Sequence, residues 1–161
     1  MNDVILFFNQ LSVVGLLFSI VVHLLGLAGR RPPFGYFAFI LQLGAFLSGV
    51  AAALALFLLY ASRGEAFWKE AFRTSPKWLK WMTCGFAGYA VLNFIVFVNL
   101  LGTIGGKRPD EITSMVFRGV SGEWMAFYSV GLLIFCSARK QLKRTEKNLS
   151  SSSLTGSTPG M

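Results

Sequence analysis

Five polar side chains interrupt otherwise apolar stretches of the chain, and any chemistry would have to be built from them. Glu123, in the stretch FRGVSGEWMAF, and His23 both titrate, so a proton could pass between them. Gln42, Asn93 and Asn99 add amide groups that donate and accept hydrogen bonds. Together these side chains predict a polar pocket that binds a lipid headgroup, a quinone-like ring or a proton.

A purely structural role for the same side chains is the interpretation that we favour. A carboxylate that faces lipid at mid-depth costs about 2.5–3.5 kcal/mol, so we expect Glu123 to reach the interface or to find a partner. Its candidate partners are His23, Arg30, Arg31 and Arg118. In this interpretation the three amide side chains form hydrogen bonds between helices and hold no ligand.

Other chemistries that membrane proteins perform lack their residues in this chain. One histidine cannot supply both axial ligands of a bis-histidine haem, and His23 with Glu123 makes too small a set for a metal. Ser121 lies near Glu123, but no nucleophile-elbow motif surrounds it. Cys84 and Cys136 form no CxxC motif, and we expect free thiols. The sequence therefore predicts no cofactor, no metal and no catalytic residue.

The composition is typical of a membrane protein. Of the 161 residues, 54% are hydrophobic and 14% are charged. Charged residues are absent from 4–29, 32–62, 81–106 and 124–138. About 20 apolar residues cross a bilayer, so these stretches are long enough, or nearly so, to span one. The net charge of +8 then indicates attraction to anionic headgroups and a topological bias, and no nucleic-acid partner is expected.

The predicted fold is an all-α integral membrane protein, an antiparallel four-helix transmembrane bundle in residues 1–140. Its spans are expected at about 4–28, 36–61, 80–101 and 120–138. Each span carries small residues that would let a neighbouring helix approach closely. These are Ser12, Gly15, Ser19 and Gly26; Ala38, Ala45, Gly49 and Ala52 or Ala53; Gly85 and Gly88; and Gly122, Ala126 and Ser129. Short connections favour up-down-up-down order.

The segments between and after the spans have patterns of their own. Residues 63–73 have the pattern of an amphipathic helix that lies in the headgroup layer on the cytoplasmic side. Residues 109–117 begin with proline and two acids and predict a short helix over the outer end. Ser75 is expected to cap the third span, with Pro76 at its first position. The basic tail, 141–161, has no apolar periodicity and is predicted to be disordered.

The distribution of Lys and Arg orients the spans. Ten lie in the tail and in the connection between the second and third spans, and five lie in the other two connections. The positive-inside rule then places both termini in the cytoplasm, under a plasma or inner membrane. The residues expected to contact anionic headgroups are Arg139, Lys140, Lys143, Arg144, Lys147, Trp68, Trp78 and Trp81.

Three classes of function remain open. We expect a non-enzymatic accessory or interaction subunit whose partner is another membrane protein or a second copy of the chain. The first alternative is a small-molecule or proton-linked carrier that uses Glu123 and His23. The second alternative is a membrane-embedded enzyme that acts on lipid.

Overall fold

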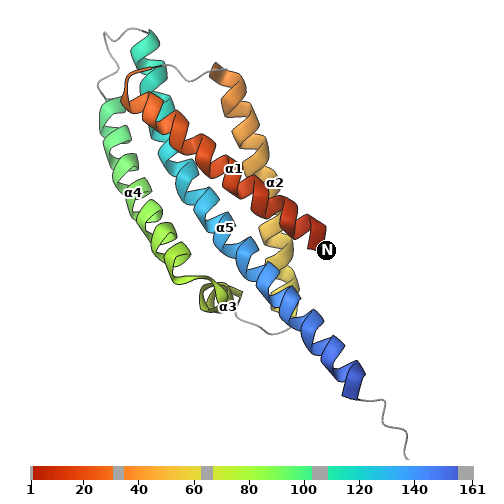
Figure 1. Cartoon of the computed structure of the whole chain (residues 1–161). Helices are drawn as coiled ribbons and strands as arrows, with labels where there is room; N and C mark the ends of the chain where they lie inside the picture. The colour runs from red at the N-terminus through yellow and green to blue at the C-terminus, as the bar shows by residue number, and fades with distance from the viewer. Residues whose placement is uncertain (1, 31–34, 63–66, 103–108, 156–161) are drawn as a thin grey trace, which may run out of the picture.

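Helices are the only regular elements in the part of the chain that the structure, a computed structural model, describes: residues 2–30, 35–62, 67–102 and 109–155. In chain order the helices are α1 (Asn2–Leu27), α2 (Gly35–Ser62), α3 (Phe67–Thr74), α4 (Lys77–Leu101) and α5 (Pro109–Thr155). The four longest are long and apolar enough to cross a membrane, and they run alternately up and down (Figure 1). The prediction of an all-helical chain with four helices of spanning length is confirmed.

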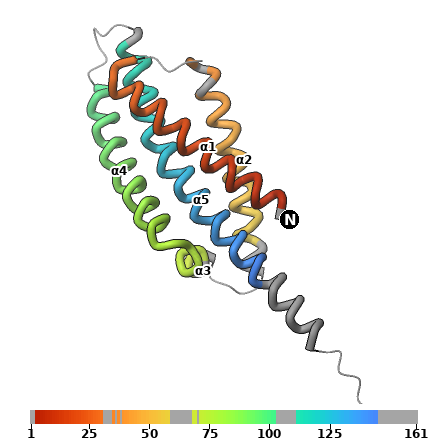
Figure 2. Tube along the Cα trace, viewed as in Figure 1, coloured from red at the N-terminus to blue at the C-terminus, as the bar shows by residue number. Residues whose placement is uncertain are grey.

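The longest helix, α5, lies at the centre of the bundle. It packs extensively against α1 on one side and α4 on the other, while α2 makes few contacts with any helix (Figure 2). In the apolar part of α5, 61% of the residues are buried, against 6% in that of α2. Helices α1 and α4 are therefore attached mainly to α5, and α2 is the helix attached most loosely.

The small residues predicted on the first span lie buried against α5. Ser12, Gly15, Ser19 and Gly26 are all buried. A Cβ atom added to Gly15 would lie 2.3 Å from the ring of Tyr128 on α5. Small residues bring helices together in this way where water provides no driving force.

The small-residue prediction for the third span was wrong. Gly85 and Gly88 are exposed, and a Cβ atom on either would meet nothing within 4 Å. The glycines at this contact belong to α5 instead, where a Cβ atom on Gly119 would lie 2.4 Å from the ring of Phe97 on α4. A large side chain of one helix fills the space that a glycine leaves on the other, so only one of the two helices needs small residues.

The structure also corrects the prediction of separate helices at 109–117 and 120–138, because α5 runs through both without a break. The two predicted helices left only Arg118 and Gly119 between them. One glycine costs a helix about 1 kcal/mol relative to alanine, which is too little to end a helix that packs on both sides.

The prediction of a disordered tail from residue 141 is corrected as well, because α5 continues to Thr155. The residues after Ala138 are mainly Lys, Arg, Gln, Leu and Glu, which favour helix. Extending a helix that is already formed adds one hydrogen bond for each residue fixed, without a new nucleus. Residues 156–161 lie outside the described part of the chain.

The amphipathic helix expected at 63–73 is present as α3, which lies across the end of the bundle (Figure 1). Residues 63–66 lie outside the described part. Ser75 does not cap α4, since its hydroxyl lies 2.8 Å from the carbonyl oxygen of Ala71 and 3.2 Å from that of Leu133. The N-cap of α4 is Pro76, without a side-chain hydrogen bond. Ser75 therefore holds α3 against α5.

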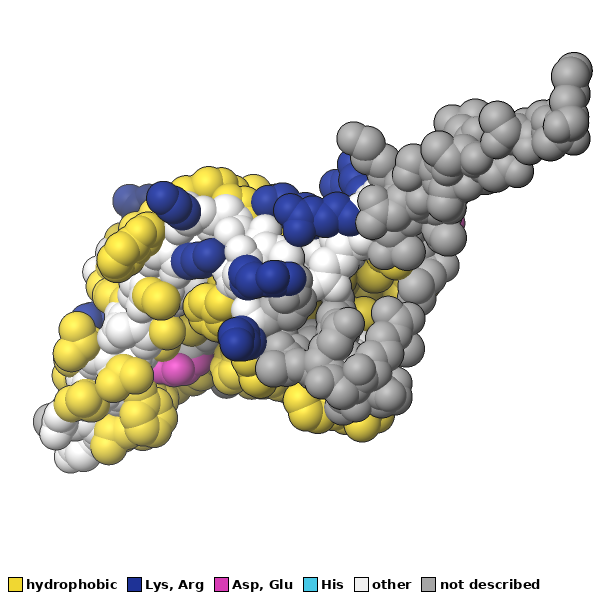
Figure 3. All heavy atoms as spheres, turned by 90° about the horizontal axis from the view of Figure 1, so that it is seen from below, with side chains coloured by type: hydrophobic (Ala, Val, Ile, Leu, Met, Phe, Trp, Pro, Cys, Tyr) yellow, Lys and Arg dark blue, Asp and Glu magenta, His cyan; other side chains and the backbone are white. Residues whose placement is uncertain are grey.

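The residues expected at lipid headgroups gather at this end of the molecule. Trp68, Trp78 and Trp81 are 51%, 63% and 78% exposed. Figure 3, which views the same end, shows Lys and Arg side chains clustered there. The exposed cations of α5 are Arg139, Lys140, Lys143 and Arg144, and the side chain of Lys147 lies outside the described part.

Candidate functional site

His23 of α1 joins three helices through hydrogen bonds. Its Nδ1 atom lies 3.0 Å from the carbonyl oxygen of Arg118 and 3.1 Å from Oγ of Ser121, both on α5. Its Nε2 atom pairs with the hydroxyl of Tyr89 on α4. A neutral imidazole satisfies these contacts, with Nδ1–H donating to Arg118 and Nε2 accepting from Tyr89. His23 therefore links α1, α4 and α5.

The contact between Ser121 and His23 has the residue types of a nucleophile and a base, but not their arrangement. The hydroxyl of Ser121 donates to the carbonyl oxygen of Phe117 at 2.5 Å, and Nδ1–H of His23 is directed at Arg118. In the tautomer that donates to Arg118, Nδ1 carries a proton and cannot take that of the serine. The two side chains are only 1% and 4% exposed, which leaves a substrate no access.

Two of the amides also form hydrogen bonds between helices. Nε2 of Gln42 on α2 donates to Oγ of Ser19 on α1 at 2.6 Å. Nδ2 of Asn93 on α4 donates to the carbonyl oxygen of Gly119 on α5 at 2.8 Å. The third amide, Asn99, is exposed and donates to a carbonyl of its own helix. Interhelical hydrogen bonds of this kind contribute about 0.6 kcal/mol on average within a membrane.

Glu123 lies apart from these contacts. Gly122 is in contact with α4 and Trp124 with α2, so Glu123 lies between the two lines of contact. It is two residues from Ser121, about 200° around the helix, and so on the other side of α5 from His23. Its Oε1 atom is buried and has no hydrogen-bond partner within the described ranges. The structure therefore does not gather the five polar residues into one pocket.

Two apolar cavities lie along the side of α5 that faces α2. One, of about 180 Å³, is bounded by Phe39 of α2 and by side chains of α5 that include Val116 and Val120. The other, of about 110 Å³, lies between α1, α2 and α5 and is bounded by Phe127 among others. Glu123 is three residues after Val120 and four before Phe127, so it lies on the same stripe of the helix, between the cavities.

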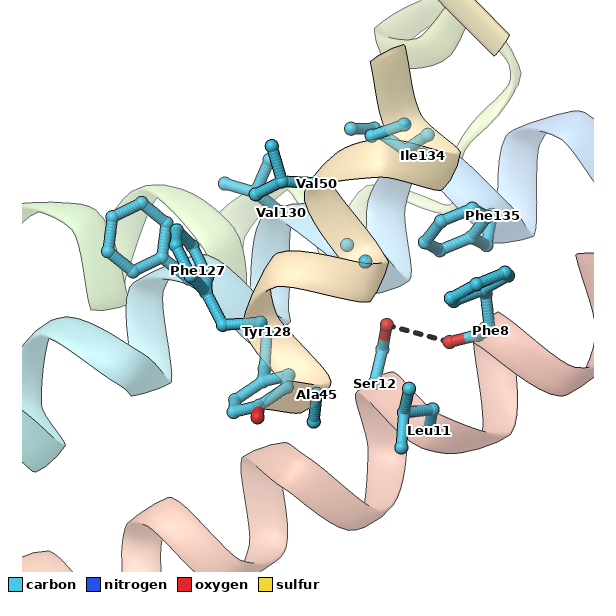
Figure 4. A pocket seen from close by; sticks show the side chains of 14 residues that line it. Phe8, Leu11, Ser12, Ala45, Val50, Phe127, Tyr128, Val130, Ile134 and Phe135 are labelled. Carbon is cyan, nitrogen blue, oxygen red and sulfur yellow. Dashed lines mark hydrogen bonds between the residues drawn. The ribbon is translucent and has the colours of Figure 1, made fainter. Parts of the chain in front are cut away.

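The second cavity has few polar atoms. Figure 4 shows its lining, which is contributed by three helices and includes the aromatic rings of Phe8, Phe127, Tyr128 and Phe135. The hydroxyl of Ser12 donates to the carbonyl oxygen of Phe8 at 2.8 Å and is therefore satisfied within its own helix. An apolar cavity of this kind stays dry or takes apolar groups.

Aromatic rings attach α2 to α5 between the cavities. Trp124 packs edge-on with Phe39 and Phe46, at centroid distances of 6.2 and 5.5 Å. The rings of Phe46 and Phe127 are 4.7 Å apart. This aromatic cluster was not predicted from the sequence. The signal for it was the seven-residue spacing of Phe39 and Phe46, which places both on one face of a helix.

The described part of the chain contains neither a cluster of metal ligands nor a disulfide. Within the described ranges, no group of three or more His, Cys, Asp or Glu side chains could hold a metal ion. Cys84 and Cys136 are both free thiols, the first exposed and the second half-buried. The polar side chains near α5 thus serve mainly to join helices, and Glu123 is the exception.

Comparisons with known proteins return no match. No model of a protein family, no curated protein and no solved structure matches the chain. Its function has to be argued from its own residues.

The hydrogen bond between His23 and Tyr89 can be tested by a double-mutant cycle. We expect His23→Ala to lower the free energy of unfolding by about 2 kcal/mol, since it leaves a small void and removes the partner of both the Arg118 carbonyl oxygen and the Tyr89 hydroxyl. The coupling with Tyr89→Phe should be about 1 kcal/mol. Unfolding by sodium dodecyl sulfate in mixed micelles measures both. Asn99→Ala is the control and should change stability by less than about 0.5 kcal/mol; additive effects of His23→Ala and Tyr89→Phe would mean that no such bond exists.

Proposed function

We propose that the chain is a four-span integral membrane protein that works as a non-enzymatic accessory subunit, binding one transmembrane helix of a partner protein. The partner helix lies along α5, beside Glu123, in the gap between α2 and α4. Three observations support the membrane assignment: four helices of spanning length, apolar side chains over the outside of the bundle, and Trp with Lys and Arg at one end.

The proposed topology places both termini and α3 in the cytoplasm of a plasma or inner membrane. It is supported by the basic residues of α3, of the start of α4 and of α5 beyond Ala138, which lie at one end of the bundle. An alkaline phosphatase fused after Met161 should be inactive, and a fluorescent protein fused there should fluoresce. Active phosphatase would reverse the topology.

The observation that carries the accessory role is the half-buried side chain of Glu123, whose carboxylate has one oxygen without a hydrogen-bond partner in the described ranges. Lipid tails cannot donate a hydrogen bond to it, whereas a polar or basic side chain of a neighbouring helix can. The surface around it is apolar, and Phe127, one turn further along, is 52% exposed. The occupant that satisfies both the carboxylate and this surface is an apolar helix with one Lys, Arg, Asn, Gln, Ser or Thr at the depth of Glu123.

Site-specific photocrosslinking in the native membrane tests this role. A photoreactive phenylalanine at position 127 should crosslink to one polypeptide, and the product should fall at least tenfold when Glu123→Leu is added. The same probe at Leu17, which is 59% exposed on α1, is the control and should give no such product. Equal products from both positions, or a product that persists in Glu123→Leu, would contradict the proposal; a crosslinked dimer would replace the partner protein with a second copy of the chain.

A further inference from the structure

The end of the bundle that carries α3 is a built surface, assembled from two segments far apart in sequence. Ala71 of α3 and Leu79 of α4 are only 3% and 0% exposed, so this corner is packed into the protein. The hydroxyls of Thr74 and Ser137 are hydrogen-bonded to each other. Nζ of Lys140 donates to the carbonyl oxygen of Thr74 at 3.3 Å. With the contacts of Ser75 described above, these bonds hold α3 against α5.

The attachment of α3 to α5 brings the cations of two segments onto one face of the molecule. The segments 67–80 and 139–144 contain eight Lys and Arg residues and a single acid, Glu70. Figure 3 shows basic side chains clustered over this face. The Lys and Arg residues of these two segments are Lys69, Arg73, Lys77, Lys80, Arg139, Lys140, Lys143 and Arg144. Neither segment alone would present charge of this density at a fixed position.

We propose that this face, which we call the basic end face, is a preorganised binding surface for the phosphate headgroups of anionic lipids. The proposal does not depend on the accessory role. Exposed Trp68, Trp78 and Trp81 lie in the same segments as the cations, and tryptophan prefers the headgroup layer of a bilayer. The apolar body of α4 follows directly, so a lipid bound here would keep its chains beside the bundle. The tryptophans favour lipid headgroups over an acidic protein or a nucleic acid as the occupant, because they lie where the apolar helices reach the headgroup layer.

The basic end face differs from a flexible basic tail because its cations are held at fixed positions before a lipid binds. Apart from the bond of Lys140, the hydrogen bonds that fix α3 come from Thr74, Ser75 and Ser137, which carry no charge. Breaking them leaves every cation in the chain but loosens the attachment of one set to the other. A flexible set of cations must be ordered when a headgroup binds, and that ordering weakens binding.

Lipid titration followed by native mass spectrometry tests the proposal on the purified full-length protein. The probes are phosphatidylglycerol and phosphatidylcholine with identical chains. We expect the wild-type protein to bind the anionic lipid at least tenfold more tightly. Lys77→Gln with Lys143→Gln should lower this preference at least fivefold, because each cation near an anionic headgroup is worth about that factor. Arg30→Gln with Arg118→Gln, two cations of the other end, is the matched control and should leave it unchanged.

Two uncharged variants test the role of the docking. Thr74→Val with Ser137→Val should lower the preference about threefold while keeping all eight cations. Where that pair does not fold, as judged by circular dichroism, Ser75→Ala removes one of the bonds more mildly and should act in the same direction. A preference that both uncharged variants retain in full would overturn the preorganised surface. Equal binding of the two lipids to the wild-type protein, or equal loss in the control, would overturn the lipid site altogether.

Discussion

Gly122→Ala is expected to lower the free energy of unfolding by about 2–3 kcal/mol. The added Cβ atom would lie 2.3 Å from Nδ2 of Asn93 and 2.8 Å from its Cγ. Asn93 is buried, so it cannot turn away into open space. It would have to move, and its hydrogen bond to the carbonyl oxygen of Gly119 would be lost along with the close approach of α4 and α5. Titration with sodium dodecyl sulfate in mixed micelles measures the change.

Gly88→Ala is the matched control for this prediction. It adds the same methyl group to a helix glycine, but Gly88 is exposed and the new atom would meet nothing within 4 Å. We expect a change of less than about 0.5 kcal/mol. Asn93→Ala should recover part of the loss caused by Gly122→Ala, because it removes the side chain that the methyl group displaces. Equal losses at Gly122 and Gly88 would show that α4 does not pack at Gly122.

Glu123→Leu is expected to act in the opposite direction and to raise the free energy of unfolding of the isolated protein by about 1–2 kcal/mol. The wild-type carboxylate has a buried oxygen without a hydrogen-bond partner in the described ranges, on an otherwise apolar stripe of α5. A leucine fits that stripe and leaves no polar atom unpaired. Glu123→Gln keeps an unpaired polar group there and should change stability much less. The same micelle titration distinguishes the two.

The control for Glu123→Leu is the removal of another acid of the same helix. Glu111 is exposed in the first turn of α5, where the positive end of the helix dipole stabilises an acidic side chain. Glu111→Leu should therefore leave stability unchanged or lower it slightly. If Glu123→Leu lowers stability instead, the carboxylate has a partner within the isolated protein. The proposed partner helix would then have no vacant acceptor to bind.

The gain in stability and the loss of crosslinking at Glu123 belong together. A side chain that weakens the isolated protein, yet is needed for one crosslink, is a residue kept for binding. If Glu123 served only folding, its replacement by leucine would lower both the stability of the isolated protein and the amount of crosslinked product.

The helices of spanning length could be predicted from sequence because length and apolarity alone decide them. The ends of the elements could not, since Gly119 and the basic residues after Ala138 are as compatible with a helix as with a break. Packing decides such cases, and packing depends on neighbours that the local sequence does not identify. Gly85 and Gly88 show this most clearly, because their spacing suits a helix contact and no helix in the described ranges approaches them.

The candidate site was predictable as a set of residues but not as an arrangement. Polar side chains in a spanning helix turn away from lipid, and His23, Gln42 and Asn93 do so. Which neighbour each one meets depends on the order of helices around α5. That order places His23 and Glu123 on opposite sides, so two residues that seemed a natural pair have separate surroundings. Tyr89, which completes the contacts of His23, has no distinguishing sequence signal.

The unbroken course of α5 has a mechanical consequence. Its 47 residues measure about 70 Å at a rise of about 1.5 Å per residue, more than twice the hydrocarbon thickness of about 30 Å. A helix of that length has no proline inside it at which to kink. When one end of such a helix changes its tilt, the other end therefore tilts with it. On the proposed topology, a helix that seats beside Glu123 near the outer leaflet would lever the cytoplasmic end of α5 sideways across the inner leaflet.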